Sequence, residues 1–397
     1  MMPKIKDHKM TIYLDNGATT AVDKNVLEAM LPFFQEKYGN ASSIHQLGQD
    51  ARKVVEEARQ KIADALGAEA KEIIFTSGGT ESDNLAIKGV ARANKEKGNH
   101  IITTKIEHPA VLSTCEELEK EGFAVTYLDV DKDGFVSAEE LEKAITDKTI
   151  LVSIIHGNNE IGTVQNIDAL GKICKEKGVL FHIDAVQSFT KVTIDVSKIN
   201  VDLISISAHK IHGPKGVGAL YVRKGTKLKP LMQGGGHEFR KRPGTENVPG
   251  IVGFAKAAQI AAIVDTSKIA ELRDHAFRRI IKEVDNIKIN GPRGALRLCN
   301  NINISFANVE GEALGSYLDI DRICVSTGSA CSSQTLEPSH VLLAIGLSKE
   351  IANGTLRMTL SKYTTKEEID KAVDSLKIHI EKLRAISPLN TVLENVQ

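Results

Sequence analysis

The chain has 397 residues, with 51 basic and 51 acidic side chains and five scattered cysteines. Such a balanced charge favours neither nucleic acid nor an anionic membrane as a partner, and the length predicts two domains rather than one ordinary core. An odd number of cysteines argues against a disulfide framework and for a reducing compartment. Because no signal-peptide pattern or spanning apolar segment is visible, we expect a cytoplasmic protein.

Short, mostly apolar and β-branched runs alternate with helix-period segments along the first part of the chain. Near-continuous apolar character is typical of strands that are buried on both faces. The expected strands cover residues 73–75, 101–103, 125–128, 150–155, 179–183, 203–207 and 219–222, and the helices between them cover 81–97, 110–120, 137–144 and 167–177. This pattern predicts an α/β fold, with a mostly parallel seven-stranded sheet and helices on both faces.

The remainder of the sequence is typical of a smaller α+β domain. A long helix over residues 252–284 is expected to lead into two strands, at 302–306 and 323–325, and into helices at about 338–344 and 366–385. We therefore assign residues 21–260 to a large α/β domain, and residues 1–20 together with 261–397 to the small domain.

Polar side chains gather just after the predicted strands, where open α/β sheets bind their ligands. Gly79 and Thr80 lie in a glycine-rich turn that opens a helix, and the unpaired N–H groups of such a turn suit a phosphate. Asp184 ends an apolar strand, where a carboxylate needs a cation or hydrogen-bond donors. Lys210 and His108 follow two further strands, and a partly desolvated lysine can form an imine.

Each of these residues also has an ordinary structural explanation. The turn can simply start a helix, Asp184 can form a structural salt bridge, and most lysines are solvated surface groups. Their coincidence at neighbouring strand ends favours a site for pyridoxal 5'-phosphate, because proteins hold this cofactor through a lysine Schiff base with an aspartate on the pyridinium nitrogen. Gln187, within a helical turn of Asp184, is placed to reach the phenolic oxygen of the ring.

At these residues the sequence resembles the NifS/IscS-type cysteine desulfurases, class V members of the fold-type I pyridoxal-phosphate enzymes. The motifs that carry the resemblance lie at residues 13–20, 76–84, 205–210, 328–333 and 336–339. The resemblance implies that His108 stacks on the cofactor ring and that Asn159 and Arg357 meet the substrate, Arg357 by a two-pronged grip on its carboxylate. It also implies that Thr80, Ser207 and His209 hold the phosphate, and that Thr245 reaches the phosphate of the neighbouring subunit in a homodimer. The residues expected to bind the cofactor are Gly79, Thr80, His108, Asn159, Asp184, Gln187, Ser207, His209, Lys210 and Thr245.

Cys331 lies in a small, polar stretch that is typical of an exposed loop, whereas Cys324 lies among apolar residues of a predicted strand. By the resemblance, Lys210 removes the α-proton of L-cysteine, His108 moves a proton, and Cys331 takes the sulfur as a persulfide. L-Alanine leaves, and the sulfur passes to an acceptor such as an iron–sulfur scaffold or a thiolation protein. The alternatives are a selenocysteine lyase, a same-fold aminotransferase, or a non-catalytic sulfur-carrier module.

Residues 129–140 match the D-x-D-x-D-G-x5-E pattern of a calcium loop. An EF-hand needs an incoming helix, however, and residues 125–128 have a strand pattern, while Ser137 and Glu140 form a capping box for the helix that follows. We therefore expect no calcium binding here. We expect no metal elsewhere, because the remaining histidine and cysteine pairs lack the further ligands of a closed site.

Overall fold

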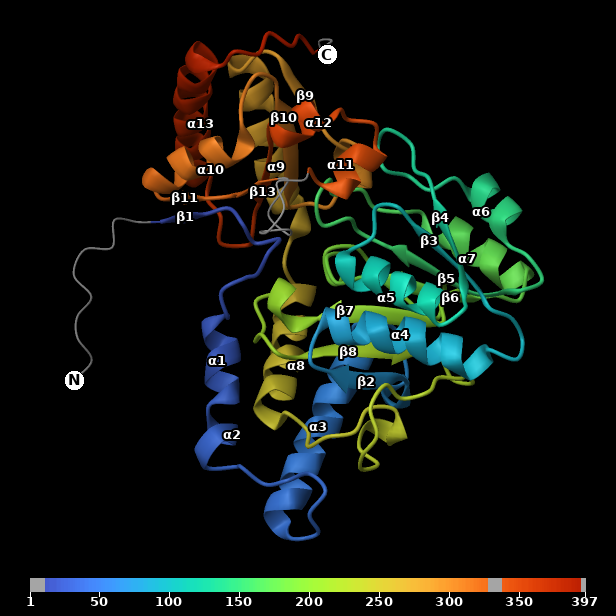
Figure 1. The fold of residues 1–397 in the computed structure, drawn as a ribbon. Helices are drawn as coiled ribbons and strands as arrows, with labels where there is room; N and C mark the ends of the chain where they lie inside the picture. The colour runs from blue at the N-terminus through green and yellow to red at the C-terminus, as the bar shows by residue number, and fades with distance from the viewer. Residues whose placement is uncertain (1–10, 328–337, 394–397) are drawn as a thin grey trace.

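The computed structural model describes residues 11–327 and 338–393, and its central element is a seven-stranded sheet (Figure 1). The strand order is β2-β8-β7-β6-β5-β3-β4, and β8 runs antiparallel to both of its neighbours while the other pairs are parallel. The mostly parallel seven-stranded sheet is therefore confirmed. Its strands are β2 (Ile73–Thr76), β3 (His100–Thr104), β4 (Ala124–Leu128), β5 (Thr149–Ile155), β6 (Leu180–Asp184), β7 (Leu203–Ser207) and β8 (Gly218–Val222).

Helices cover both faces of this sheet, because successive side chains of each strand point to opposite sides. The helices of this part are α1 (Lys24–Met30), α2 (Pro32–Gln35), α3 (Gln46–Asp64), α4 (Gly79–Asn94), α5 (Pro109–Lys120), α6 (Ala138–Ala144), α7 (Ile167–Glu176) and α8 (Val248–Ala262). Ile73 and Phe75 of β2 pack into one core with α3, α7 and α8, whereas Ile74 packs into a second core with α4 and α5. The apolar alternation along each strand thus fixes which helices lie on which face.

The second part of the molecule is built around a four-stranded antiparallel sheet in the order β12-β13-β10-β9, and Figure 1 shows its helices at the end of the molecule opposite α3. A short N-terminal strand, β1, pairs in parallel with β11. The elements are β1 (Ile12–Tyr13), α9 (Thr266–Glu283), β9 (Ile287–Ile289), β10 (Asn301–Phe306), α10 (Gly311–Ile320), β11 (Ile323–Cys324), β12 (Ser326–Thr327), α11 (His340–Ala344), α12 (Lys349–Asn353), β13 (Thr355–Thr359) and α13 (Lys366–Ile386).

Each part has an apolar core of its own, and a smaller cluster joins the two parts through Ile106 and Ile155 on one side and Val341 and Leu342 on the other. In the large part, the core that includes Ile73 and Phe75 is built from residues between Val26 and Ala258. In the small part, a different core joins Ile12 and Leu14 to side chains of α9, β10, β13 and α13. The N-terminal strand belongs to this core although Ile323, with which Ile12 pairs, lies more than 300 residues away in sequence. These separate cores support our proposal that the domains divide after residues 20 and 260.

The predicted continuous helix over residues 252–284 is wrong. The chain forms α8 and α9 instead, with a bend of 73° between them. Asp265 ends the continuity because its side chain accepts a hydrogen bond from the N–H of Ser267 at 3.1 Å and so caps a new helix. Among the described helices, none alone is long and apolar enough to cross a membrane, and α8 with α9 meets that length and composition only as a bent pair.

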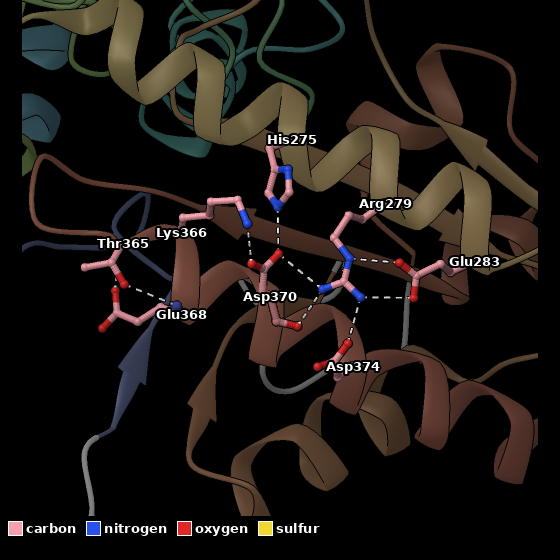
Figure 2. Close-up of polar contacts among 8 residues, drawn as sticks. All are labelled: His275, Arg279, Glu283, Thr365, Lys366, Glu368, Asp370 and Asp374. Atoms are coloured by element: carbon pink, nitrogen blue, oxygen red, sulfur yellow. Dashed lines mark hydrogen bonds and ion pairs between the residues drawn. The ribbon is translucent and has the colours of Figure 1, made fainter.

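An ion-pair network fastens α9 to α13 (Figure 2). Arg279 of α9 donates to Asp370 at 3.2 Å and to Asp374 at 2.7 Å on α13, and it also pairs with Glu283 on its own helix at 2.8 Å. His275, one helical turn before Arg279, lies 2.6 Å from the same Asp370 carboxylate. Two helices that are far apart in sequence are thereby joined by one guanidinium with several acceptors.

The segment with the calcium-loop pattern is a turn between β4 and α6. A strand precedes it, as expected, and the Oδ1 atom of Asp131 accepts the N–H groups of Asp133 and Phe135 at 2.9 and 2.8 Å. Ser137 caps α6 by accepting the N–H of Glu140 at 3.3 Å. Within residues 11–327 and 338–393, no three His, Cys, Asp or Glu side chains are grouped so that they could hold a metal ion.

Candidate active site

A cavity of about 420 Å³ opens at the carboxyl ends of the parallel strands, where the second part of the chain faces the sheet. It is lined by Asp15, Gly17, Ala18, Gly79, Thr80, Asp83, His108, Ile155, Asn159, Asp184, Val186, Gln187, His209, Lys210, Ser326 and Arg357. Most of the predicted site residues are therefore brought together. Ser207 and Thr245 do not line the cavity, and Cys331 lies outside the described residues.

The N-terminus of α4 forms one end of the cavity. Gly79 begins this helix against Val186, and a Cβ atom at Gly79 would lie 2.6 Å from Val186 Cγ2, so only glycine fits here without a shift. The first N–H groups of an α-helix have no partners within the helix. The hydroxyl of Ser207 is buried without a hydrogen-bond partner close to Gly78. A buried, unpaired hydroxyl beside a helix N-terminus is suited to a phosphate group.

Asp184 lies at the end of β6 and is 4% exposed. Its Oδ1 atom accepts the N–H of Val186 at 2.8 Å, and burial raises the pKa of its carboxyl group to about 6. Asp83, on α4, is also buried, and burial together with the charge of Asp184 raises its pKa well above the usual value. Since two adjacent carboxyl groups cannot both carry charge cheaply, we assign the proton to Asp83 and the charge to Asp184.

Lys210 faces Asp184 from the turn after β7. Its Nζ atom donates to the carbonyl oxygens of Gly17 and Ala18 at 2.6 and 2.9 Å. Burial lowers the pKa of this amine to about 8, assisted by the positive charges of Arg357 and Lys191. A lysine with a lowered pKa supplies the neutral amine that attacks a carbonyl or takes a proton.

His108 is both a helix cap and a cavity residue. Its Nδ1 atom accepts the N–H of Ala110 at 3.1 Å at the start of α5. Burial, and next the charge of Lys210, lower the pKa of the imidazole to about 4. The ring is therefore neutral near pH 7, and because Nδ1 is an acceptor, its proton is on Nε2.

Arg357 of β13 reaches the cavity from the second part of the chain and is 7% exposed. Its Nη1 atom donates to the carbonyl oxygen of Asn159 at 3.1 Å, and its Nη2 atom lies 3.2 Å from Asp15 Oδ1. The Nε atom of Arg357 and the Oδ1 atom of Asn159 are buried without hydrogen-bond partners. The free N–H of the guanidinium suits a carboxylate, whereas the free oxygen of Asn159 can accept a hydrogen bond from an N–H group of a ligand.

The surroundings of Gln187, His209 and Thr245 bear on the roles predicted for them. Gln187 donates from Nε2 to the carbonyl oxygen of Gly17 at 2.8 Å, so its amide nitrogen is engaged by the N-terminal segment. His209 lies with Nδ1 3.1 Å from Thr19 Oγ1. Thr245 is exposed and does not line the cavity of its own chain.

Sequence reasoning missed the contribution of residues 15–18 and of Asp83. The N-terminal segment touches Lys210, Gln187 and Arg357, but its residues lie far from them in sequence and carry no strand-end signal. Asp83 lies on α4, just after the glycine-rich turn at Gly78 and Gly79. A carboxyl group on the buried face of this helix is unusual, and this could have marked Asp83 as a site residue. Ser326, which precedes the stretch with Cys331, also lines the cavity.

The model of the aminotransferase class-V family matches residues 12–372. A cysteine desulfurase IscS of Dictyoglomus turgidum is 55% identical over 383 residues, which cover 96% of this chain and 97% of that protein. The chain belongs to the class-V family, among the cysteine desulfurases. A cysteine desulfurase IscS of Methanosarcina thermophila is also similar, at 51% identity over 388 residues, covering 97% of this chain and 96% of that protein.

Solved structures of similar proteins share the fold. A NifS-like protein superimposes with a TM-score of 0.88 at 42% identity, covering 94% of this chain and all of that one. The structure titled "SspA in complex with cysteine" has a TM-score of 0.81 and 41% identity, covering 89% of this chain and all of that one. The resemblance to NifS/IscS-type proteins and the fold-type I architecture are therefore confirmed.

Proposed function

We propose that this chain is a pyridoxal-phosphate-dependent cysteine desulfurase that converts L-cysteine to L-alanine and passes the sulfur on through a persulfide of Cys331. The observation that carries the proposal is the convergence of Lys210, Asp184, His108 and Arg357 on one cavity at the strand ends. An amine with a lowered pKa, a buried carboxylate and a neutral imidazole together suit imine chemistry at an amino acid.

The residues present fit pyridoxal 5'-phosphate. The phosphate would be held at the N-terminus of α4 by Gly79 and Thr80, with the unpaired hydroxyl of Ser207 and the His209 ring nearby. The remaining groups would be Asp184 at the ring nitrogen, Gln187 at the phenolic oxygen, His108 and Asn159 beside the ring, and Lys210 at the aldehyde carbon. When bound, the cofactor supplies an electron sink for the electrons left at the α-carbon of the amino acid.

The side chains around this position have separate tasks. Arg357 binds the carboxylate and orients the α-carbon, because its unpaired Nε–H can donate to it, and the unpaired Oδ1 atom of Asn159 accepts from an N–H group of the substrate. Lys210, once its amine is released by the substrate, takes the α-proton at Nζ. His108 holds a proton at Nε2 and delivers it during the reaction, since its Nδ1 atom is fixed by the N-cap contact.

Cys331 completes the proposed reaction. Its thiolate attacks the substrate sulfur, so that a sulfur–sulfur bond forms as the carbon–sulfur bond breaks, and the electrons of the broken bond stay with carbon. The β-carbon takes up a proton, the α-carbon regains the proton that Lys210 removed, and alanine leaves. The persulfide then passes its terminal sulfur to an acceptor thiol, on an iron–sulfur scaffold or a thiolation protein, as the IscS names of the relatives support.

A homodimer is part of this proposal. Apolar side chains are exposed along α1, α2 and the start of α3, and a second copy of the chain would cover them. They are Leu27, Leu31, Phe34, Tyr38 and Ile44, exposed by between 48% and 89%. Thr245 is exposed and does not line the cavity of its own chain, which supports its predicted role at the phosphate of a second copy. A cytoplasmic location is likewise proposed, supported by the unpaired thiols of Cys115, Cys174, Cys299 and Cys324.

The test is to incubate the purified chain with pyridoxal phosphate, L-cysteine and a thiol reductant. Alanine and sulfide should form in equal amounts. A selenocysteine lyase would consume L-selenocysteine but leave L-cysteine intact, and an aminotransferase would release a keto acid in place of alanine. Either result would replace the proposed activity while keeping the family.

A further inference from the structure

The only carboxylate paired with Arg357 among residues 11–327 and 338–393 is Asp15, whose Oδ1 atom lies 3.2 Å from Nη2. Asp15 is 21% exposed and lines the same cavity. The neighbouring Nε atom of Arg357 is buried and has no hydrogen-bond partner. A guanidinium normally binds a carboxylate through two parallel N–H groups. Here the Nη2 group is paired with Asp15, whereas the Nε–H group has no partner.

The position of Asp15 is fixed by the fold. Asp15 forms an isolated parallel bridge with Thr359, and the N–H of Thr359 donates to the carbonyl oxygen of Leu14 at 2.6 Å. The N–H of Gly17 donates to Thr359 Oγ1, also at 2.6 Å. Because Thr359 and Arg357 are alternate residues of β13, they point to the same side of the strand. The backbone therefore holds the Asp15 carboxylate beside the guanidinium.

A substrate carboxylate that binds the unused edge of Arg357 would meet the Asp15 carboxylate directly. Two like charges beside one cation repel each other, and the incoming group must displace Asp15 or share the guanidinium with it. An amino acid with a second carboxylate in its side chain would bring a further negative charge into a cavity that already contains Asp15 and Asp184. Asp15 therefore weakens the binding of every carboxylate and weakens that of an acidic amino acid most.

We propose that Asp15 is a specificity-determining residue, which occupies Arg357 in the free protein and restricts the site to α-amino acids with an uncharged side chain. Competition between Asp15 and the ligand also keeps the product from binding tightly, because alanine carries the same carboxylate as cysteine. The inference rests on the proposed function only in so far as Arg357 receives the amino acid's carboxylate.

The test compares the wild type with Asp15→Asn, whose amide oxygen can still accept from Arg357 Nη2 and so preserves the local structure. Binding of L-alanine and of L-aspartate to the cofactor-loaded protein is measured by titration calorimetry, which does not depend on turnover. We expect L-alanine to bind about three- to tenfold more tightly to the variant and L-aspartate to gain more than that. Asp147→Asn makes the same change in net charge at a side chain that is 85% exposed, and it should alter neither constant.

Thermal unfolding of each variant checks that it is folded, and Asp15→Ser provides a second neutral variant if the asparagine is unstable. Equal or weaker binding of both ligands by the neutral variants would overturn the inference and leave Asp15 as a structural partner of Arg357. A wild type that binds L-alanine but forms no sulfide from L-cysteine would overturn the proposed function alone. A wild type that binds neither L-alanine nor L-cysteine would overturn both.

Discussion

The Nζ atom of Lys191 lies 3.4 Å from the carbonyl oxygen of Lys210 and 2.8 Å from that of Gln187. The described residues place no carboxylate in a salt bridge with Lys191, and burial lowers the pKa of its amine to about 8. A second amine thus holds the backbone of Lys210 and adds positive charge behind it. The charged groups that face Lys210 are Arg357 and Lys191, which lower its pKa, and Asp184 and Asp15, which raise it.

Lys191→Met should therefore raise the pKa of Lys210. With one cation removed, the amine of Lys210 is protonated to higher pH, so the apoprotein should react with pyridoxal phosphate more slowly at pH 7.5. The midpoint of this rate against pH should move upward by less than about one pH unit. Lys191→Arg retains the charge and should retain the wild-type midpoint. An unchanged midpoint in the methionine variant would limit Lys191 to a structural role.

Asp184→Asn and Asp83→Asn should have opposite outcomes although both remove a carboxyl group from the same wall. Asp184 is the charged member of the pair, so its amide no longer favours a protonated ring nitrogen, and turnover should fall by about a hundredfold or more while cofactor is retained. Asp83 is the member of the pair to which we assign the proton, and asparagine keeps its shape, so we expect turnover to change by less than about threefold. Cofactor absorbance and steady-state rates for both variants measure this, and a silent Asp184→Asn would make Asp184 a structural residue.

The strand-end residues were predictable from the sequence because a parallel sheet brings its carboxyl ends to one edge. Asp184, Lys210 and His108 each follow an apolar run, and the structure places all three in one cavity. Asp15 and Lys191 carried no such signal. Asp15 meets Arg357 across 342 residues because it forms a bridge with Thr359 of β13. The Nζ atom of Lys191 lies against backbone carbonyl oxygens, which the sequence does not reveal. The hydrophobic periodicity of a local segment cannot predict either of these contacts.

The predicted helix over residues 252–284 is a second feature that hydrophobic periodicity alone could not describe correctly. The apolar pattern of α8 runs into the amphipathic pattern of α9, and periodicity alone joins them. The capping residue Asp265 was a local signal that outweighs this pattern, because its side chain satisfies an N–H at the start of α9. A boundary is therefore better read from caps than from the hydrophobic period when two helices meet end to end.

Stability of the apoprotein should be greatest near pH 6.5 to 7. Burial lowers the pKa of His156 to about 4 and that of His182 to about 3, so the unfolded chain binds protons that the folded one does not, and stability falls as pH drops below about 6.5. Burial raises the pKa of Glu107 to about 8, so the folded chain holds a proton that the unfolded chain releases above about pH 4.5. That contribution is lost as pH rises towards 8.

Glu107→Gln isolates the alkaline part of this profile. The glutamine oxygen can still accept from Thr104 Oγ1 and from the N–H of Ile155, which lie 2.6 and 2.9 Å from Glu107 Oε1. The variant should therefore keep its fold, and its free energy of unfolding should fall by about 1 kcal/mol less between pH 7 and 8 than that of the wild type. Urea unfolding at a series of pH values measures both curves, and parallel curves would contradict the assignment to Glu107.

Arg279→Met should lower the free energy of unfolding by about 1 to 2 kcal/mol, because this guanidinium joins α9 to α13 through Asp370 and Asp374. The loss should shrink at high salt, which screens partly exposed charges. Lys120→Met removes an exposed pair with Glu117 on one helix and should cost less than about 0.5 kcal/mol. Urea titrations at low and high salt measure both free energies of unfolding. Equal losses of stability in the two variants would show that the network in Figure 2 stabilises the fold no more than an exposed surface ion pair does.

Cys331→Ser separates cofactor chemistry from sulfur transfer. The substitution leaves Lys210 and Asp184 in place, so L-cysteine should still change the absorbance of the bound cofactor. A serine hydroxyl is a far weaker nucleophile towards sulfur than a thiolate and cannot hold a persulfide, so sulfide and alanine release should fall by about a hundredfold or more.

Cys324→Ser is the matched control, because Cys324 lies on β11 with its backbone paired to β1, and burial raises the pKa of its thiol. This variant should release sulfide at close to the wild-type rate. Rapid-scan spectra and a sulfide assay on the three proteins decide the matter. Sulfide release at the wild-type rate by Cys331→Ser would exclude Cys331 as the sulfur acceptor, and loss of activity only in Cys324→Ser would move that role to Cys324.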